Sequence, residues 1–333
     1  MKAFIMDRYG KADVLRAGEA PEPPLREDDV LVQIHAASVN PLDVKIRDGE
    51  FKLLLPYRFP LILGNDMAGV VVRIGAAVRG FSVGDEVYAR PDDDRIGAFA
   101  EFIAIRESSL ALKPKTLTME QAAAMPLVAL TAWQALVERG GLKKGQKVLI
   151  HAGSGGVGTV AIQLAKHLGA TVATTASAAN AAMLKQLGAD IVIDYKNDDF
   201  SLLLNDYDLV LDTQGGVTQK KSVAVLKRGG KMIGIAGPPD PDFAKARGVN
   251  PLVGLVMRAL SLGVRKKAKA AGASYSFLYM GASGEQLRRI AGLIDAGAIR
   301  PVVDRVFPFA ETREALACVE TGRAKGKVVI KVR

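Results

Sequence analysis

The chain has 333 residues, of which 49% are hydrophobic and 24% charged, as in an ordinary globular protein large enough for two domains. No apolar run reaches the roughly 18 residues of a membrane helix, and the first residues lack the apolar stretch of a secretory signal, so we expect a cytoplasmic protein with no membrane partner. The net charge is +10, but no basic stripe with interleaved aromatic residues accompanies it, which argues against nucleic acid as a partner.

The first 115 residues predict a β-rich domain. Short β-branched segments follow one another at residues 30–39, 67–75, 85–90 and 98–106. Glycine and proline separate these segments, a pattern typical of a small barrel or sandwich.

Near residue 119 the hydrophobic period changes from strand to helix. A helical segment over 119–140 is interrupted near Pro126, and strands then alternate with helices. We expect strands at 148–153, 171–176, 191–195, 209–213 and 231–237, with helices at 157–169 and 180–188. This βαβ alternation predicts a parallel, doubly wound sheet.

The last third returns to the β pattern. A helix is expected over 251–262, an apolar strand over 276–282 and a helix over 284–297. The tail then predicts two strands around a short helix. The predicted domains are therefore a β domain made of 1–122 and 298–333, and an α/β domain made of 123–297.

A glycine-rich segment, HAGSGGVG (151–158), carries the clearest functional motif. Gly153, Gly155 and Gly158 have G-x-G-x-x-G spacing, after an expected strand and before an expected helix, which is the context of a dinucleotide site. The helix N-terminus favours a pyrophosphate; the alternative is a plain strand-to-helix turn. The candidate cofactor-binding residues here are Gly153, Ser154, Gly155, Gly156, Val157 and Gly158.

The end of the second α/β strand discriminates between the two nicotinamide cofactors. NAD-binding proteins usually place Asp or Glu there to hold the ribose, but residues 174–184 contain no carboxylate. Ser177 and Asn180 are available to donate hydrogen bonds to a 2′-phosphate. Both also fit as helix caps, and the two roles are compatible. The sequence therefore predicts NADPH as the cofactor.

The sequence contains few of the residues that usually bind metal ions. Cys318 is the only cysteine, so no cysteine cluster can hold zinc, and the only histidines are His35, His151 and His167. His35 fits better as a strand residue than as a metal ligand. We expect no metal.

Seven segments together resemble one known family: AASVNPLDVKIRDG (36–49), PLILGNDMAGVV (60–71), GDEVYA (84–89), AAMPLVALTAW (123–133), HAGSGGVG (151–158), LGADIVIDY (187–195) and GKVVIKV (326–332). The chain resembles the zinc-independent quinone oxidoreductase branch of the medium-chain dehydrogenase/reductase superfamily over essentially its whole length. The resemblance implies a GroES-like β domain formed by both chain ends and a Rossmann domain, with the cofactor in the cleft between them.

The resemblance also implies roles for individual residues. Asn40 and Thr131 are expected near the nicotinamide, as positioning groups. Many relatives have lysine where this chain has Asn180, which leaves Arg323 as the main cationic partner. The 2′-phosphate is expected among Ser177, Asn180, Tyr195 and Arg323, and the nicotinamide and its ribose among Ala236, Gly237, Phe277 and Leu278.

The sequence departs from the zinc alcohol dehydrogenases of the superfamily at the metal position. Those enzymes have Cys where this chain has Asn40, and a His–Glu pair near Asn65 and Asp66. Two amides and one carboxylate are a poor zinc set. Without a Lewis acid, the expected reaction is hydride transfer from NADPH to an already electrophilic small molecule, a quinone or an α,β-unsaturated carbonyl.

The sequence leaves the proton source and the exact function open. The proton for enone reduction has three possible sources, Tyr57, Lys45 or solvent, and Asp43 either orients a neighbour or caps a turn. The candidate catalytic residues are Asn40, Tyr57 and Thr131. The alternative functions are a non-enzymatic NADPH-binding or redox-sensing protein and a zinc-free reductase of other carbonyl compounds. Because relatives often pair the strand at 276–282 across a two-fold axis, we expect a homodimer.

Overall fold

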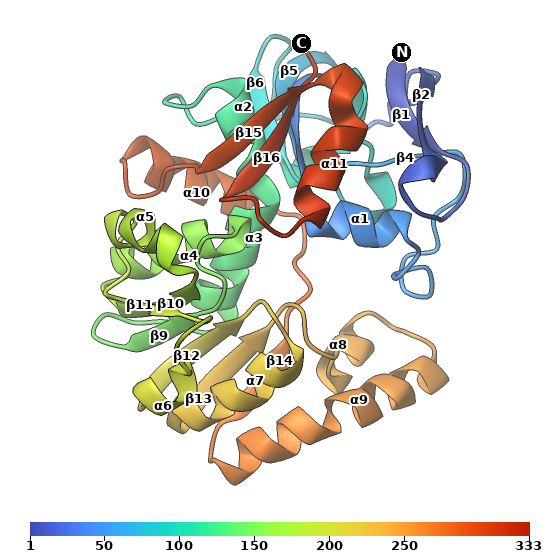
Figure 1. Cartoon of the computed structure of the whole chain (residues 1–333). Helices are drawn as coiled ribbons and strands as arrows, with labels where there is room; N and C mark the ends of the chain where they lie inside the picture. Colours follow the sequence, from blue (N-terminus) through green and yellow to red (C-terminus); the bar gives the residue numbers. More distant parts are fainter. The chain divides into compact units, whose positions relative to one another are not determined.

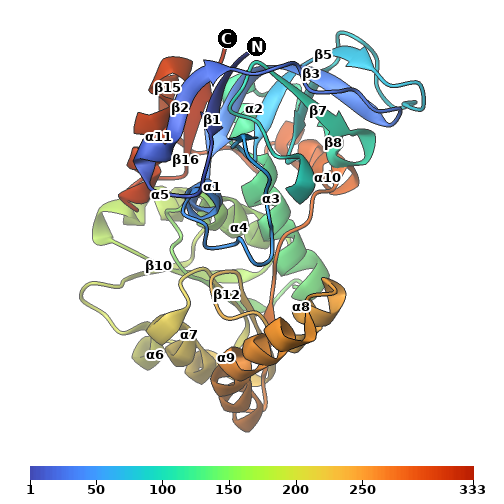
Figure 2. The same ribbon diagram turned by 90° about the vertical axis from the view of Figure 1, so that its right-hand side faces the viewer.

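The computed structural model describes residues 1–333, which form two compact units (Figure 1). The first unit consists of Met1–Leu130 and Gly281–Arg333, and the second consists of Thr131–Met280. The second unit is thus an insertion into the first, and both chain ends lie in the first unit (Figure 2). None of the helices combines the length and the apolar character needed to cross a bilayer.

The first unit is built on two β-sheets. The larger has the strand order β15-β16-β3-β5-β6-β8, with β7 also paired to β3, and the smaller has the order β2-β1-β4. The strands are β1 (Lys2–Met6), β2 (Leu15–Glu19), β3 (Asp29–Val39), β4 (Leu61–Ile62), β5 (Met67–Ile74), β6 (Glu86–Ala89), β7 (Phe102–Arg106), β8 (Leu110–Leu112), β15 (Val303–Pro308) and β16 (Lys327–Lys331). The predicted β-rich fold of this part of the chain is confirmed.

Strand β3 shows why the sequence folds in this way. Its β-branched residues Val30, Val32 and Ile34 are fully buried, whereas Gln33 and His35 on the opposite face are partly exposed. The period of two places one side of the strand in the core. His35 is therefore a strand residue, as predicted.

Short helices close the first unit. They are α1 (Pro41–Arg47), α2 (Met119–Ala123), α10 (Gly284–Asp295) and α11 (Thr312–Glu320), together with the first part of α3 (Pro126–Trp133). Helix α11 lies against β15 and β16 (Figure 1). The single cysteine, Cys318, lies on α11.

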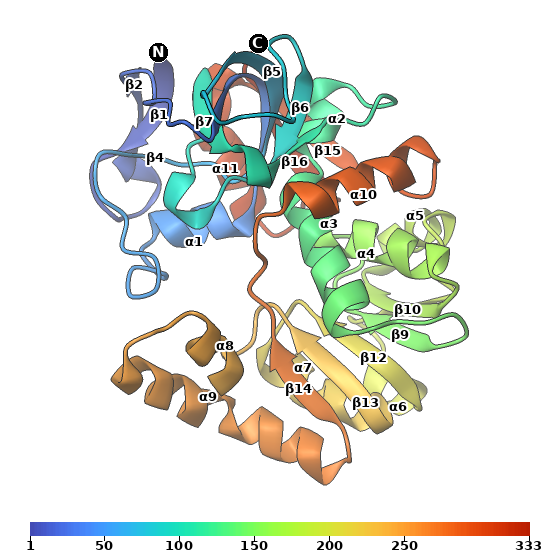
Figure 3. The same ribbon diagram turned by 180° about the vertical axis from the view of Figure 1, so that it is seen from behind.

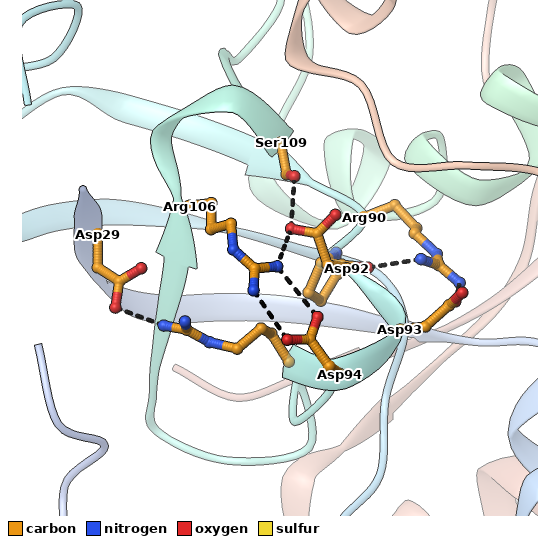
Figure 4. A network of polar contacts seen from close by, with 9 residues as sticks. Asp29, Arg90, Asp92, Asp93, Asp94, Arg106 and Ser109 are labelled. Atoms are coloured by element: carbon orange, nitrogen blue, oxygen red, sulfur yellow. Dashed lines mark hydrogen bonds and ion pairs between the residues drawn. The ribbon is translucent and has the colours of Figure 1, made fainter. Parts of the chain in front are cut away.

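The connection after β6 is held by charged side chains (Figure 4). Arg106 on β7 pairs with Asp92 at 2.9 Å and with Asp94 at 2.8 Å. Arg90 pairs with Asp93, and the hydroxyl of Ser109 donates to Asp92 at 2.9 Å. Arg90 and Ser109 are buried, and the side chains of Arg106 and Asp92 are less than a third exposed, so these contacts are better shielded from solvent than isolated surface ion pairs.

The second unit is a six-stranded parallel sheet of order β11-β10-β9-β12-β13-β14. In chain order this is 3-2-1-4-5-6, the Rossmann arrangement, in which ligands bind at the carboxyl ends of the strands. The strands are β9 (Lys147–Ile150), β10 (Thr171–Ala176), β11 (Ile191–Asp194), β12 (Tyr207–Asp212), β13 (Leu226–Gly234) and β14 (Ser274–Phe277). The predicted doubly wound α/β fold is confirmed.

Helices cover both faces of this sheet, with α4 and α5 on one face and α7 and α9 on the other (Figure 2). The helices are α4 (Gly156–His167), α5 (Ala181–Gln186), α6 (Phe200–Leu203), α7 (Gly216–Ser222), α8 (Pro241–Ala246) and α9 (Pro251–Ala270). Helix α9 extends beyond the predicted 251–262, and it lies beside β14 (Figure 3). Strand β14 begins earlier and ends earlier than the predicted 276–282.

The observed units differ from the predicted domains mainly in the position of α10. The sequence placed residues 284–297 with the α/β domain, but α10 packs on the β unit. The hydroxyl of Tyr88 donates to the carbonyl of Leu287 at 2.7 Å, and a Cβ at Gly284 would lie 2.2 Å from the carbonyl oxygen of Leu110. Such contacts between residues nearly 200 positions apart leave no periodic signal in the sequence.

Candidate functional site

The glycine turn after β9 is shaped by close backbone contacts. A Cβ at Gly153 would lie 2.1 Å from the hydroxyl oxygen of Thr174, and one at Gly158 would lie 2.4 Å from the carbonyl oxygen of Ala152. Gly155 is different, since its Cβ would meet only that same oxygen, at 3.3 Å. Gly153 and Gly158 are thus required for packing inside the turn, whereas Gly155 leaves space on the outside.

Helix α4 begins in this turn and presents unpaired donors. Its N-cap is Gly155, which has no side chain to cap the helix. The backbone N–H groups of Gly156, Val157 and Gly158 have no acceptor within the chain, as is usual for the first turn of a helix. The helix dipole adds partial positive charge at this point. The turn, which includes the partly exposed Ser154, therefore fits a pyrophosphate.

Three of the four residues expected around a 2′-phosphate lie together in the second unit. Ser177 directly follows β10, Asn180 donates from Nδ2 to its Oγ at 3.2 Å, and Tyr195 directly follows β11 with its backbone N–H bonded to Ala176. The nearby carboxylate of Asp194 is occupied by Lys196 N–H and Asn197 Nδ2. Arg323 belongs to the first unit, in the turn after α11.

The residues expected around the nicotinamide also share one sheet edge. Ala236 and Gly237 follow β13, Phe277 ends β14, and Leu278 comes directly after it, with its N–H donating to the carbonyl of Gly234 at 2.8 Å. The side chain of Gln219 would lie 2.0 Å from a Cβ at Gly237. All four residues are thus at the carboxyl ends of neighbouring parallel strands, where this fold binds ligands.

A buried carboxylate that the sequence analysis missed holds this edge together. Asp240 accepts a hydrogen bond from Phe243 N–H, which caps α8, and another from Phe277 N–H, both at 2.8 Å. It therefore links the segment after β13 to the end of β14. Its position after Pro238 and Pro239 suggested only a loop, because the partner at Phe277 is distant in the sequence.

His151, which opens the glycine turn, is fully buried. Its Nε2 lies 2.8 Å from the hydroxyl of Ser222 and its Nδ1 lies 3.0 Å from the hydroxyl of Thr175. Burial lowers the pKa of His151 to about 4, so the ring is neutral at pH 7. It therefore ties α7 to the ends of β9 and β10, and this placement makes it a structural support of the turn.

The first unit contains a buried polar cluster that we call the Asn40 cluster: Asn40, Asp43, Asn65, Asp66 and Lys327. Asp43 accepts from Asn40 N–H and from Asn65 Nδ2, both at 2.7 Å. Asn40 Nδ2 donates to Asp66 at 2.8 Å, and the ammonium of Lys327 donates to both Asn40 and Asp66. Burial raises the pKa of the Asp43 carboxyl to about 6, and the charge of Asp66 adds to the rise.

The Asn40 cluster does not fit a zinc ion. Structural and catalytic zinc sites use Cys, His or carboxylate ligands, whereas Asn40 and Asn65 are amides and Asp66 is already paired with an ammonium. No group of three or more His, Cys, Asp or Glu side chains in the structure is arranged to hold a metal ion. In the sequence, Lys327 is one residue of the GKVVIKV segment, and nothing local distinguishes it from the other lysines.

Three further residues were named from the sequence as catalytic residues or proton sources: Tyr57, Thr131 and Lys45. Tyr57 packs against the core of the first unit, and its backbone N–H donates to the hydroxyl of Tyr9 at 3.2 Å. Thr131 is buried on α3. Lys45 is half exposed and lies 3.9 Å from Glu50. Lys45, one of the three possible proton sources named from the sequence, is therefore a surface residue with Glu50 as its ion-pair partner.

Comparisons with known proteins identify the family. Two family models match: an alcohol dehydrogenase GroES-like domain at residues 26–115 and a zinc-binding dehydrogenase at residues 187–330. NAD(P)H oxidoreductase RTN4IP1, mitochondrial, of Mus musculus is 37% identical over 356 residues, which cover 100% of this chain and 89% of the relative. NADPH-dependent alkenal/one oxidoreductase, chloroplastic, of Arabidopsis thaliana is 36% identical over 341 residues, covering 99% and 79%.

A solved structure gives the same result. The quinone oxidoreductase from Coxiella burnetii matches with a TM-score of 0.87 and 34% identity, covering 100% of this chain and 99% of that one. Fold and glycine turn together define a two-domain, dinucleotide-binding oxidoreductase. The chain belongs to the medium-chain dehydrogenase/reductase superfamily, in its quinone oxidoreductase branch.

One expectation from the sequence is wrong. We expected a cytoplasmic protein, but the mouse relative is named a mitochondrial protein and the Arabidopsis relative a chloroplastic one. The expectation rested on the lack of an apolar leader, which argues only against secretion, since organellar transit peptides are amphipathic.

Proposed function

We propose that this protein is an NADPH-dependent oxidoreductase that transfers hydride to quinones or activated α,β-unsaturated carbonyls without catalytic zinc. The observation that carries the proposal is the start of α4, where three backbone N–H groups without acceptors follow a glycine turn. The names of the Arabidopsis and Coxiella relatives, an alkenal/one oxidoreductase and a quinone oxidoreductase, supply the two acceptor classes.

The cofactor would be held at the carboxyl ends of the parallel strands. The turn at 153–158 would receive the pyrophosphate. Ser177, Asn180 and Tyr195, together with Arg323 from the first unit, would receive the 2′-phosphate, whose charge favours cationic and hydroxyl donors. The nicotinamide and its ribose would lie against Ala236, Gly237, Phe277 and Leu278. When bound, NADPH supplies the hydride.

The protein's own part in the reaction is to bind, orient and exclude water. Asn40 and Thr131 would position the acceptor and the nicotinamide face to face, which is worth a large share of the rate in a reaction of two bound reactants. Reduction of an enone needs one hydride and one proton. The proton would come from Tyr57 or from solvent, because the only buried histidine, His151, is enclosed by Ser222, Thr175 and Phe200.

Steady-state oxidation of NADPH tests the proposal. The acceptors are a quinone, an enone, an aldehyde and, in reverse with NADP⁺, ethanol. We expect turnover with the quinone or the enone and negligible oxidation of ethanol. If the protein binds NADPH and reduces none of these, it is a non-enzymatic NADPH-binding protein. If the aldehyde is preferred, it is a reductase of other carbonyl compounds.

We further propose that the protein is a homodimer. Strand β14 is the outer strand of its sheet and pairs only with β13, and an unpaired edge invites pairing with a second chain. Antiparallel pairing of β14 across a two-fold axis would join the two sheets. Light scattering at micromolar concentration is the test, and a mass of 35.3 kDa, that of one chain, would reject the dimer.

A further inference from the structure

Lys327 is a lysine in an interior position. It is 5% exposed and begins β16, where Val328, Val329 and Ile330 are buried aliphatic residues. Burying an ammonium group destabilises a protein unless the charge is paired and every N–H donor is hydrogen-bonded.

The ammonium has three N–H donors, and the structure supplies three acceptors. These are the carbonyl oxygen of Val39 at 3.2 Å, Asp66 Oδ2 at 3.2 Å and Asn40 Oδ1. The charge is balanced by Asp66, which is fully buried and also accepts from Ser38 Oγ at 2.9 Å. The cation is thus fully satisfied and fixed at one place.

This pairing decides the orientation of the Asn40 side chain. A lysine ammonium can only donate, so the atom of Asn40 that faces it must be the oxygen. The nitrogen must then face Asp66, to which it donates at 2.8 Å. Nδ2 makes this one hydrogen bond, which uses one of its two hydrogens and leaves the second hydrogen for another acceptor.

We propose that Lys327 is a positioning residue: it holds the Asn40 carboxamide in a single orientation, so that the remaining Nδ2 hydrogen serves as a fixed donor to the bound reactants. The step beyond Asn40 rests on the proposed function, in which Asn40 lies at the nicotinamide. The effect on Asn40 itself is independent of that function.

The ammonium also accounts for the poor fit of this cluster to a metal ion. It donates to both Asn40 and Asp66, so these two side-chain oxygens are already engaged by a cation that belongs to the chain itself.

The main test is Lys327→Met, which removes the charge and the donors but keeps the length of the side chain. The matched control is Lys331→Met, on the same strand, where the side chain is 56% exposed and pairs with Glu120 at 3.5 Å. Because exposed pairs contribute little, the control is expected to behave as the wild type.

The first readout is the side-chain amide signal of Asn40 in ¹⁵N NMR spectra, assigned with Asn40→Ala. We expect one slowly exchanging NH₂ pair in the wild type and in Lys331→Met, and a shifted or averaged pair in Lys327→Met. This readout needs no acceptor and no turnover. An unchanged Asn40 signal in Lys327→Met would overturn the positioning role even if the proposed reaction is correct.

The second readout is kinetic. We expect Lys327→Met to lower kcat about tenfold to a hundredfold, as misplacement of a positioning group does, with NADPH affinity within twofold of the wild type. Adding Lys327→Met to Asn40→Ala should cause no further loss, because both changes remove the same donor. Losses that multiply would show that Lys327 acts elsewhere. Absence of turnover in the wild type would reject the proposed function and leave the NMR result standing.

A third variant separates positioning from charge balance. Lys327→Met leaves the Asp66 carboxylate without a cationic partner and should therefore lower the melting temperature, whereas Lys327→Met combined with Asp66→Asn leaves no charge without a counterion. We expect the double variant to regain melting temperature but not turnover or the Asn40 signal. If neutralising Asp66 restores turnover, Lys327 is only a counterion and the proposal is wrong.

Discussion

Replacing Gly158 with alanine tests whether the glycine turn depends on close backbone contacts. The new Cβ would lie 2.4 Å from the carbonyl oxygen of Ala152 and 2.6 Å from the Cα of Gly153. Both neighbours are backbone atoms, so the clash is relieved only if the start of α4 moves away from the turn.

The size of the effect follows from two opposing terms. Overpacking of this kind costs about 1–3 kcal/mol. Alanine is the better helix former by up to about 1 kcal/mol, and Gly158 lies in the first turn of α4. We therefore expect a net loss of roughly 1–2 kcal/mol. For a unit of this size that lowers Tm by about 2–8 °C. Because the unpaired N–H groups move with the helix, NADPH affinity should fall as well.

Gly155→Ala is the matched control. Its Cβ would meet only the Ala152 oxygen, at 3.3 Å, and its backbone has an ordinary φ of −79°. We expect a Tm close to that of the wild type but weaker NADPH binding, since a methyl group would stand where the pyrophosphate approaches. Circular dichroism gives Tm and fluorescence titration gives the affinity. Gly158→Ala with unchanged Tm and affinity would refute the packing argument, and Gly155→Ala with unchanged affinity would refute the placement of the pyrophosphate.

Three further predictions concern charge. NADPH should bind roughly tenfold to a hundredfold more tightly than NADH, from one charge-assisted phosphate contact, and Arg323→Ala should weaken NADPH binding alone; equal affinities in a fluorescence titration would contradict this. Burial raises the pKa of Asp43 from 3.8 to about 6 in the folded protein, so the folded state binds more protons than the unfolded chain between these pH values. The free energy of unfolding should therefore fall by roughly 3 kcal/mol as pH rises through this range. Asp43→Asn should remove this pH dependence in urea unfolding between pH 4 and 6.5, and an unchanged dependence would show that the carboxyl is not the titrating group. Elemental analysis after dialysis should find no stoichiometric zinc, because Asn40 and Asn65 are poor ligands; about one zinc per chain, lost together with activity on chelation, would refute it.

His151 has the opposite pH dependence in the same window. Its pKa is lowered to about 4 by burial, so the unfolded chain takes up the proton first and stability contributed by the neutral ring is lost as pH falls from 6.5 towards 4. In the wild type, the free energy of unfolding therefore contains a contribution from Asp43 that falls with rising pH and one from His151 that rises with it. Comparing wild type with Asp43→Asn isolates the carboxyl, since His151 is present in both.

The sequence by itself determined the architecture and the cofactor turn. The alternation of strand and helix periods from residue 148 onward requires a parallel sheet, because each strand is buried on both faces and each helix on one. The turn at Gly153–Gly158 is local, with all its close contacts inside one βαβ unit, so spacing alone located it. Ser177 and Asn180 were proposed by the same local logic, from the missing carboxylate after the second strand of the sheet, whereas Tyr195 was named only by the family resemblance.

Only the tertiary structure decided which distant groups meet. Lys327 and Asn40 are 287 positions apart, and no pattern around either residue indicates the other. Asp240 likewise acquires its role from Phe277, and α10 joins the β unit through Tyr88. The physical reason is common to all three. Periodicity reports which face of an element is buried, whereas hydrogen-bond partners, the orientation of an amide and the pKa of a buried carboxyl depend on which other element is packed against that face.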